Sequence, residues 1–304
     1  MPQLPSHFDR ATKEFSDIRR QFYMYWEAYE EILENHDKND DYISEYLNEC
    51  TDAQKLDLGY VSALRGTLER QLNRISLEYT AGAPIEELKG MYPAAVDIFE
   101  AWCFAYRDWS FHEFPDVREE YEAENKTPCQ VKLNVTTDYL ELLRLLSLGI
   151  LFKEDAQLLR IAKLIQPLRR EDTVIEELLM VFVPDSYEMN GYYHVNLYGD
   201  LMSASWSKGK ESDEHMTKFL HSWYKYFQGA HWHNAHLRFG DIEDSPDWAN
   251  YYGYFAWEAA AMVYLYDLDD SAYRNHVLYP KDLVDWAFKQ GKAPKSYEPD
   301  STVY

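Results

Sequence analysis

The sequence predicts an all-α protein, a multi-helix bundle of two successive helical modules with little or no β-sheet. Apolar residues recur at spacings of three and four over most of the chain, the period of a helix packed on one side. The apolar fraction of 46% is enough for a sizeable core. Neither a Gly-rich phosphate loop nor a run of alternating β-branched residues is present, which disfavours a large sheet.

Long helices account for the first third of the chain. Residues 9–34 carry one apolar stripe, and a charged break is expected at residues 37–41. A second helix is expected over residues 52–79, ended by Gly82 with Pro84 just beyond. A third helix follows over residues 88–109, kinked or interrupted at Pro93.

An acidic stretch with prolines at residues 111–127 is the expected boundary between the modules. The expected division is an N-terminal helical domain at 7–128, a C-terminal helical domain at 131–290 and an extended tail at 291–304.

The second module opens with three expected helices joined by short loops, over residues 136–152, 153–165 and 171–183. Residues 184–213 are the least regular, and we expect turns and short helices there. Helical periodicity resumes over residues 214–238.

Near the C-terminus, Ser245-Pro246-Asp247 combines a helix cap, a first-turn proline and an acid at the positive helix end. Residues 248–265 are apolar nearly all round and predict a central buried helix. A second proline-started helix is expected from Tyr279 to a stop at Gly291.

The charge balance is the first indication of function. Thirty Lys and Arg against 53 Asp and Glu give a formal net charge of −23. Such a field repels nucleic acid and anionic lipid, so neither is expected as a partner. A basic partner would be attracted, and nucleic-acid-processing proteins are common basic proteins. Solubility is the alternative explanation of the same charge.

Cysteines and apolar segments indicate the compartment. Cys50, Cys103 and Cys129 form neither a CxxC pair nor a disulfide framework. The first residues lack the basic and apolar regions of a signal peptide. The most apolar run, residues 139–152, is too short for a membrane span. We therefore expect a cytoplasmic protein without a membrane anchor.

Three histidines, His231, His233 and His236, lie close together with Asp241 downstream. Residues 233 and 236 share a face of a helix, as two metal ligands would, so a metal-dependent hydrolase is the alternative function. The HExxH pattern is absent, and packing beside Trp223 and Trp232 is the preferred interpretation. No metal or other cofactor is predicted.

Glu258 stands inside the expected buried helix, where a carboxylate has to be paired, hydrogen-bonded or neutral. It is either a general acid or base tuned by burial, or a structural residue hydrogen-bonded to Tyr254 or a histidine, or paired with an arginine. Because no nucleophile or second catalytic carboxylate stands out, the structural role is preferred and no catalytic residue is predicted.

Acidic residues flank the same helix and are the predicted partner-binding set: Asp241, Glu243, Asp244, Asp247, Asp267, Asp269 and Asp270. Solvated loops and helix capping are the other explanation of such clusters. Residues 113–124 and 37–45 are competing acidic surfaces. Some tyrosines of the helix could also anchor a partner, although most are expected in the core: Tyr251, Tyr252, Tyr254, Tyr264 and Tyr266.

A C-terminal signature runs through Tyr252-Gly253-Tyr254, Glu258-Ala259-Ala260-Ala261, Asp269-Asp270-Ser271 and Tyr279-Pro280-Lys281-Asp282-Leu283. It resembles that of the PoNi immunity proteins. Supporting positions upstream are Leu68-Glu69, Tyr79-Thr80-Ala81-Gly82, Trp102, Trp223-Tyr224, Trp232 and His236. The resemblance covers residues 7–288, and residues 184–213 depart from it.

This resemblance implies a partner rather than a reaction. PoNi proteins are immunity proteins encoded beside PoNe-type DNase toxins, which interbacterial systems such as type VI secretion deliver. They bind the toxin in the cytoplasm and block its active site. A nuclease presents a basic groove to DNA, which an acidic inhibitor can occupy. We therefore predict a non-enzymatic immunity protein; the oligomeric state is left open.

Overall fold

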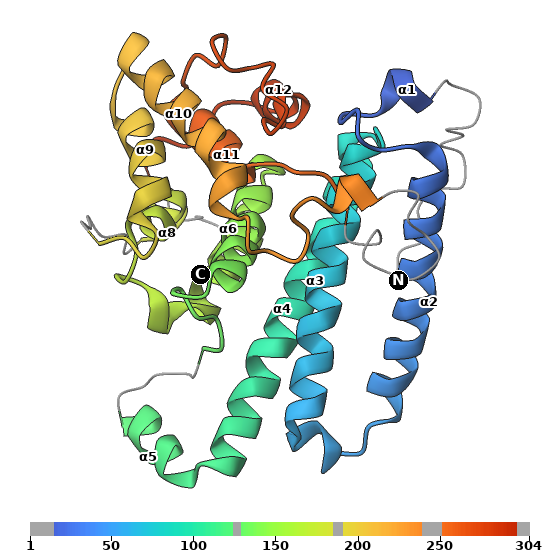
Figure 1. Cartoon of the computed structure of the whole chain (residues 1–304). Coiled ribbons are helices and arrows are strands. Elements are labelled where there is room, and N and C mark those ends of the chain that lie inside the picture. The colour runs from blue at the N-terminus through green and yellow to red at the C-terminus, as the bar shows by residue number, and fades with distance from the viewer. Residues whose placement is uncertain (1–14, 124–128, 185–190, 239–250, 297–304) are drawn as a thin grey trace. The chain divides into compact units, whose positions relative to one another are not determined.

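A computed structural model describes residues 15–123, 129–184, 191–238 and 251–296 (Figure 1). Over these ranges the chain forms twelve α-helices and no β-strand, which confirms the predicted all-α class. No helix in the same ranges has an apolar stretch long enough to cross a bilayer.

The chain divides into two compact units that do not follow the chain order strictly. Unit 1 consists of Met1–Arg118 and Gly229–Tyr254, and unit 2 of Glu119–Gln228 and Phe255–Tyr304. Helix α5 (Pro115–Ala123) contains the point of division. The expected domains at 7–128 and 131–290 remain a prediction.

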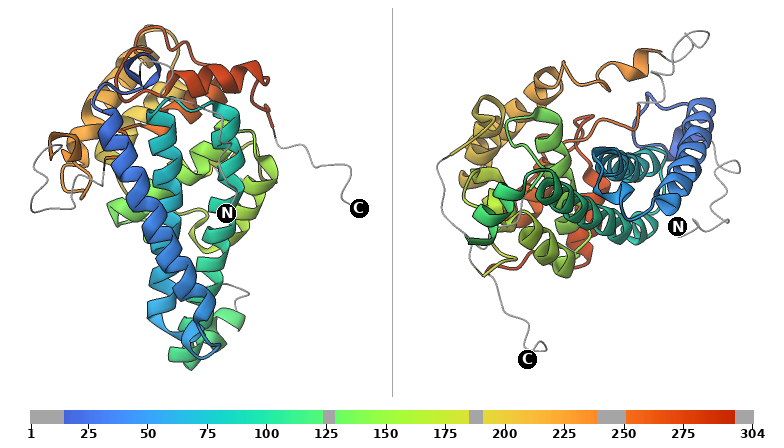
Figure 2. Two further views of the ribbon diagram at one scale, coloured as in Figure 1. Left: turned by 90° about the vertical axis from the view of Figure 1, so that its right-hand side faces the viewer. Right: turned by 90° about the horizontal axis from the view of Figure 1, so that it is seen from below.

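Unit 1 is built on three long helices that lie side by side, α2 (Trp26–Glu49), α3 (Leu58–Thr80) and α4 (Ile85–Glu113) (Figures 1 and 2). The short helix α1 (Phe15–Ile18) precedes them, and the 3-10 turn η2 (Gln54–Leu56) joins α2 to α3. Their facing stripes form the core of the unit, with fully or almost fully buried Ile32, Val61, Leu68, Leu72, Ile75, Val96 and Phe99.

The predicted break at residues 37–41 is wrong, because α2 runs through it. The charges there are paired with α3: Arg70 Nε lies 2.8 Å from Asp40 Oδ1, and Arg74 Nη1 lies 2.9 Å from Asp37 Oδ1. The helix is broken earlier instead, where Arg20 donates to the carbonyl oxygens of Tyr79 and Ala83 at 2.7 and 2.9 Å. The charged residues at 37–41 therefore do not interrupt the helix, because two of them form ion pairs with α3.

The end of α3 depends on a glycine. Gly82 has φ +88°, in the left-handed region, and a Cβ at this position would lie 2.2 Å from the backbone oxygen of Ile18. Only glycine fits both the conformation and the close approach. The expected helix stop at Gly82 is confirmed. Helix α4 continues through Pro93.

Unit 2 is centred on α11 (Trp257–Tyr266), which packs against α6 (Thr136–Leu151), α8 (Thr173–Leu179), α9 (Val195–Trp206) and α12 (Lys281–Lys289). Helix α7 (Asp155–Leu164) packs on α6, and α10 (Lys210–Tyr226) packs on α9. The connecting 3-10 turn is η3 (Gln166–Leu168), while η4 (Ala235–Arg238) belongs to unit 1. Residues 257–264 of α11 are all buried, as its apolar sequence predicts.

The region expected to hold turns and short helices contains α9, a helix of 12 residues whose Leu197, Tyr198, Leu201 and Met202 are buried. The expected start of the central helix near residue 248 is wrong, because α11 begins at Trp257 and residues 251–256 are not helical. Gly253 has φ +94° there, a conformation that ends helical geometry. Residues 245–250 lie outside the described ranges.

Candidate functional site

His236, one of the three histidines of the alternative hydrolase, belongs to an aromatic cluster in unit 1. His236 Nδ1 lies 3.0 Å from the Tyr254 hydroxyl, and its ring packs on Tyr23 with centroids 4.3 Å apart. Burial lowers the pKa of His236, and His233 lowers it further. His231 is half exposed, and its Nε2 lies 3.4 Å from Glu69 Oε1. The contacts of His236 are therefore those of a packed side chain, and His231 faces a different carboxylate from the one expected.

Metal-binding geometry is not found among the residues that the structure describes, where no group of three or more His, Cys, Asp or Glu is placed to hold an ion. Asp241, the carboxylate of the hydrolase alternative, lies outside those residues.

The Tyr252-Gly253-Tyr254 part of the signature lies in a loop that is hydrogen-bonded to other segments of unit 1. Thr80 Oγ1 donates to the Tyr252 carbonyl at 2.8 Å. The Gln21 side chain bonds both backbone groups of Tyr254, accepting from its N–H at 2.9 Å and donating to its carbonyl at 2.5 Å. The Tyr252 ring stands edge-on to His36 at 5.2 Å. These residues therefore hold the fold of unit 1.

Glu258 is the most unusual signature residue, because its carboxyl group is fully buried in unit 2. Oε1 accepts from the Tyr198 hydroxyl at 3.0 Å and from Trp223 Nε1 at 2.7 Å. Oε2 is buried and has no hydrogen-bond partner among the described residues. Burial raises the Glu258 pKa to about 7 from its ordinary value of 4.5, against the lowering effect of the two donors.

This arrangement favours the structural role of Glu258. The two neutral donors take the place of the expected Tyr254, histidine or arginine partners. A general acid or base has to reach its substrate, whereas the Glu258 side chain has no exposed surface. The carboxyl group held between Tyr198 and Trp223 connects α9, α10 and α11 in the core.

The remaining signature residues build the start of α12. Tyr279 and Pro280 are buried, Pro280 is the N-cap residue, and Leu283 is fully buried. The Tyr279 hydroxyl donates to Asp270 Oδ2 at 3.1 Å. Asp282 provides the acid of the first helical turn. The signature thus specifies local structure in both units.

Three predicted partner-binding acids are described, and their surroundings differ. Asp270 pairs with Arg274 at 2.8 Å and accepts from Tyr279, and its side chain is 15% exposed. Asp269 is exposed and accepts from the Ser271 N–H at 3.0 Å, which lowers its pKa. Asp267, in the left-handed conformation that ends α11, pairs with Lys292. Asp270 therefore has a structural role, and Asp269 is the most available of the three.

The other four predicted acids, Asp241, Glu243, Asp244 and Asp247, lie outside the described residues. The competing surface at residues 37–45 has two of its acids paired with arginines of α3. The acidic residues of α5 that are described, among them Asp116, Glu119 and Glu120, are exposed.

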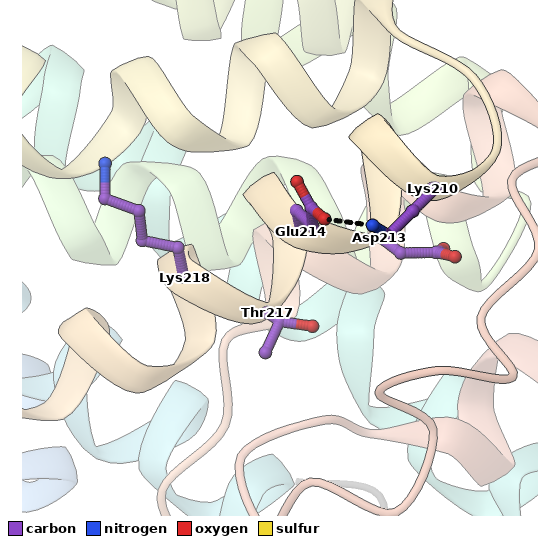
Figure 3. Close-up of a pocket in the computed structure, with 5 residues that line it drawn as sticks. All are labelled: Lys210, Asp213, Glu214, Thr217 and Lys218. Carbon is purple, nitrogen blue, oxygen red and sulfur yellow. Dashed lines mark ion pairs between the residues drawn. The ribbon is translucent and has the colours of Figure 1, made fainter.

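A surface hollow of about 440 Å³ lies on α10, lined by Lys210, Asp213, Glu214, Thr217 and Lys218 (Figure 3). Lys210 pairs with Glu214 at 3.2 Å, and Lys218 pairs with Asp200 at 2.9 Å. The hollow is shallow, and four of its five lining residues are charged. None of the five is a histidine or a cysteine. The hollow does not have the features of an active site.

Sequence reasoning missed the polar residues that organise α8. Buried Asp172 caps this helix by accepting from the Val174 and Ile175 N–H groups at 2.9 and 3.2 Å, and it also accepts from the Tyr139 hydroxyl at 2.9 Å. Arg169 and Glu176 form a two-bond ion pair with both distances at 2.7 Å. Asp172 could have been recognised as a helix cap, because it stands two residues before an apolar run. No pattern in the neighbouring sequence indicates its contact with Tyr139 or the ion pair between Arg169 and Glu176.

Two family models match this chain, and between them they span most of it. The model of the PoNe immunity protein (PoNi) N-terminal region matches residues 23–163, and that of the C-terminal region matches residues 170–283. The chain belongs to the PoNi family. The C-terminal match includes residues 184–213, which were expected to depart from the family.

A solved structure supports the fold of this PoNi protein. Protein PA2201 from Pseudomonas aeruginosa matches with a TM-score of 0.64 at 17% sequence identity, over 90% of this chain and 92% of that chain. At this identity the likeness concerns the fold alone. No curated protein matches the chain.

Proposed function

We propose that this PoNi protein binds and neutralises a cognate PoNe-type nuclease toxin in the cytoplasm of the cell that produces both, without catalysing a reaction. The match to both PoNi models carries the proposal. The toxin would reach sister cells through a system such as type VI secretion.

Charge supports a mechanism for this proposal. A nuclease needs a basic groove for DNA phosphates, and a chain of net charge −23 is complementary to such a groove. The acids that we propose to contact the toxin are Asp267 and Asp269 of unit 2 and, in unit 1, Asp241, Glu243, Asp244 and Asp247, which lie outside the described residues. Asp270 holds the turn after α11 through Arg274 and Tyr279 instead of contacting the toxin.

Association with the toxin should therefore depend on salt and on Asp269. We expect the association rate of the purified chain with the catalytically inactivated neighbouring-gene nuclease to fall about tenfold or more between 50 and 300 mM salt. Asp269→Asn removes one charge but keeps the oxygen that caps Ser271, so it should slow association by about two- to threefold at low salt. Stopped-flow fluorescence measures both effects.

Three outcomes separate the parts of the proposal. Absence of a complex contradicts the immunity function for that nuclease. If a complex forms but its association rate does not change with salt concentration, electrostatic attraction does not contribute to the mechanism. A salt-dependent rate that Asp269→Asn leaves unchanged excludes Asp269 from the contacting surface.

A further inference from the structure

A carboxylate on unit 2, that of Glu177, is bonded to one aromatic side chain and has two more nearby. We name Glu177, Tyr192, Trp206 and Tyr266 the Glu177 cluster. Glu177 is in α8, Trp206 ends α9 and Tyr266 ends α11, while Tyr192 precedes α9. All four belong to the same unit, and α8, α9 and α11 are neighbours in Figure 1.

One hydrogen bond orients this cluster, since the Tyr266 hydroxyl donates to Glu177 Oε2. The Trp206 side chain lies close enough to the Tyr266 hydroxyl to lower its pKa. Burial raises the pKa of Tyr266, as do the bond to Glu177 and the Glu177 charge, and burial together with the Glu177 charge raises the pKa of Tyr192. The phenols therefore stay neutral.

Among the described residues, Glu177 has no lysine or arginine paired with it, unlike two acids of the same unit. Its neighbour Glu176 is paired with Arg169, and Glu214 on α10 is paired with Lys210. Among the described residues no lysine or arginine pairs with Glu177, which is half-buried. A partly desolvated carboxylate without a counter-charge attracts a cation strongly.

The aromatic members add exposed surface that a cation can use. Trp206 is 51% exposed, and Met180, one helical turn after Glu177, is 39% exposed. Tryptophan, tyrosine and methionine are enriched at protein interfaces, and tryptophan is the best cation–π acceptor. A carboxylate beside such rings provides both the charge and the planar surface that a guanidinium or ammonium group prefers.

We propose that the Glu177 cluster binds an arginine or lysine side chain on the surface of the nuclease partner, an inference that rests on the proposed function. The net charge of −23 decides the occupant, because it opposes a second copy of the chain and nucleic acid but favours a basic protein. Asp267, which follows Tyr266 directly in the chain and pairs with Lys292, is one of the predicted partner-binding acids.

Two substitutions test this assignment in the full chain against the inactivated neighbouring-gene nuclease. Glu177→Gln keeps an acceptor for Tyr266 but removes the charge, and it should raise the Kd about 10- to 100-fold, mainly through faster dissociation. Trp206→Ala should raise the Kd about tenfold. Biolayer interferometry at 150 mM salt gives both rates, and circular dichroism melting checks that each variant is folded.

Glu214→Gln is the matched control, since it removes one negative charge from the same unit at an acid that already has a cation. It should change the Kd by less than about threefold. If the native chain binds and Glu177→Gln dissociates no faster than Glu214→Gln, the Glu177 cluster is excluded while the immunity function stands. If the native chain forms no complex, both proposals fail for that nuclease.

Discussion

Replacing Arg169 by alanine is expected to lower the free energy of unfolding of unit 2 by about 3–5 kcal/mol. Arg169 and Glu176 exchange two hydrogen bonds of 2.7 Å, and their side chains are only 7% and 2% exposed. Without the guanidinium, Glu176 is left as a buried charge whose one remaining donor among the described residues is the Arg170 N–H, at 2.9 Å. Desolvation of that charge is the source of the large cost.

Hydrogen exchange of the α8 amides under native conditions measures this effect, and it reports on unit 2 separately from unit 1. Lys210→Ala is the control, because the Lys210–Glu214 pair is 91% and 66% exposed and should contribute less than about 1 kcal/mol. Joint replacement by Arg169→Met and Glu176→Leu should restore much of the stability. An Arg169→Ala cost as small as that of Lys210→Ala would show that the buried pair does not stabilise unit 2.

The second large effect concerns pH and Glu258. The pKa of Glu258 is about 7 in the folded chain and near 4.5 in the unfolded chain, where the side chain is exposed. Between pH 4.5 and 7 the folded chain therefore keeps this proton, whereas the unfolded chain loses it. The contribution of Glu258 to the free energy of unfolding is therefore fully present below pH 4.5 and is lost as pH rises through about 7. By linkage the loss amounts to about 3 kcal/mol.

Glu258→Gln isolates this contribution, since an amide stays neutral while its oxygen still accepts from Tyr198 and Trp223. Relative to the native chain, the variant should gain about 3 kcal/mol of stability between pH 4.5 and 8. Hydrogen exchange of α11 at matched pH values measures it, with Glu214→Gln as the exposed control. A difference between Glu258→Gln and the native chain that stays constant with pH would mean that the buried carboxyl group is already ionised at pH 5.

Helices with local signals could be predicted from the sequence. The periodic stretch before Gly82 gave α3, although this helix begins at Leu58 and not at residue 52, and the proline-started stretch after Tyr279 gave α12; both helices stop where expected. The extent of α9 could not be predicted, because Gly199 and its tyrosines suggest turns, although burial of Leu197, Leu201 and Met202 determines its conformation. Packing overrides local propensity at such positions.

For the site too, features with a local sequence pattern could be predicted, whereas contacts that only the fold creates could not. The signature and the net charge led to the PoNi family and to a basic partner. Capping was one explanation of acids such as Asp270, but its contacts with Arg274 and Tyr279 could not be predicted, because the turn between α11 and α12 brings them to it. The Glu177 cluster was also missed, since its members come from three helices and from the segment before α9, and only the fold brings them together.

Co-expression with the nuclease encoded beside this chain tests the central claim most directly. The active toxin should stop growth of a susceptible host and degrade its DNA, whereas cells that also produce this chain should grow normally and keep intact chromosomes. Arg169→Ala provides a destabilised comparison, and its protection should fall with its folded amount. If the native chain accumulates folded but growth and DNA are not rescued, its function as the immunity protein of that nuclease is contradicted.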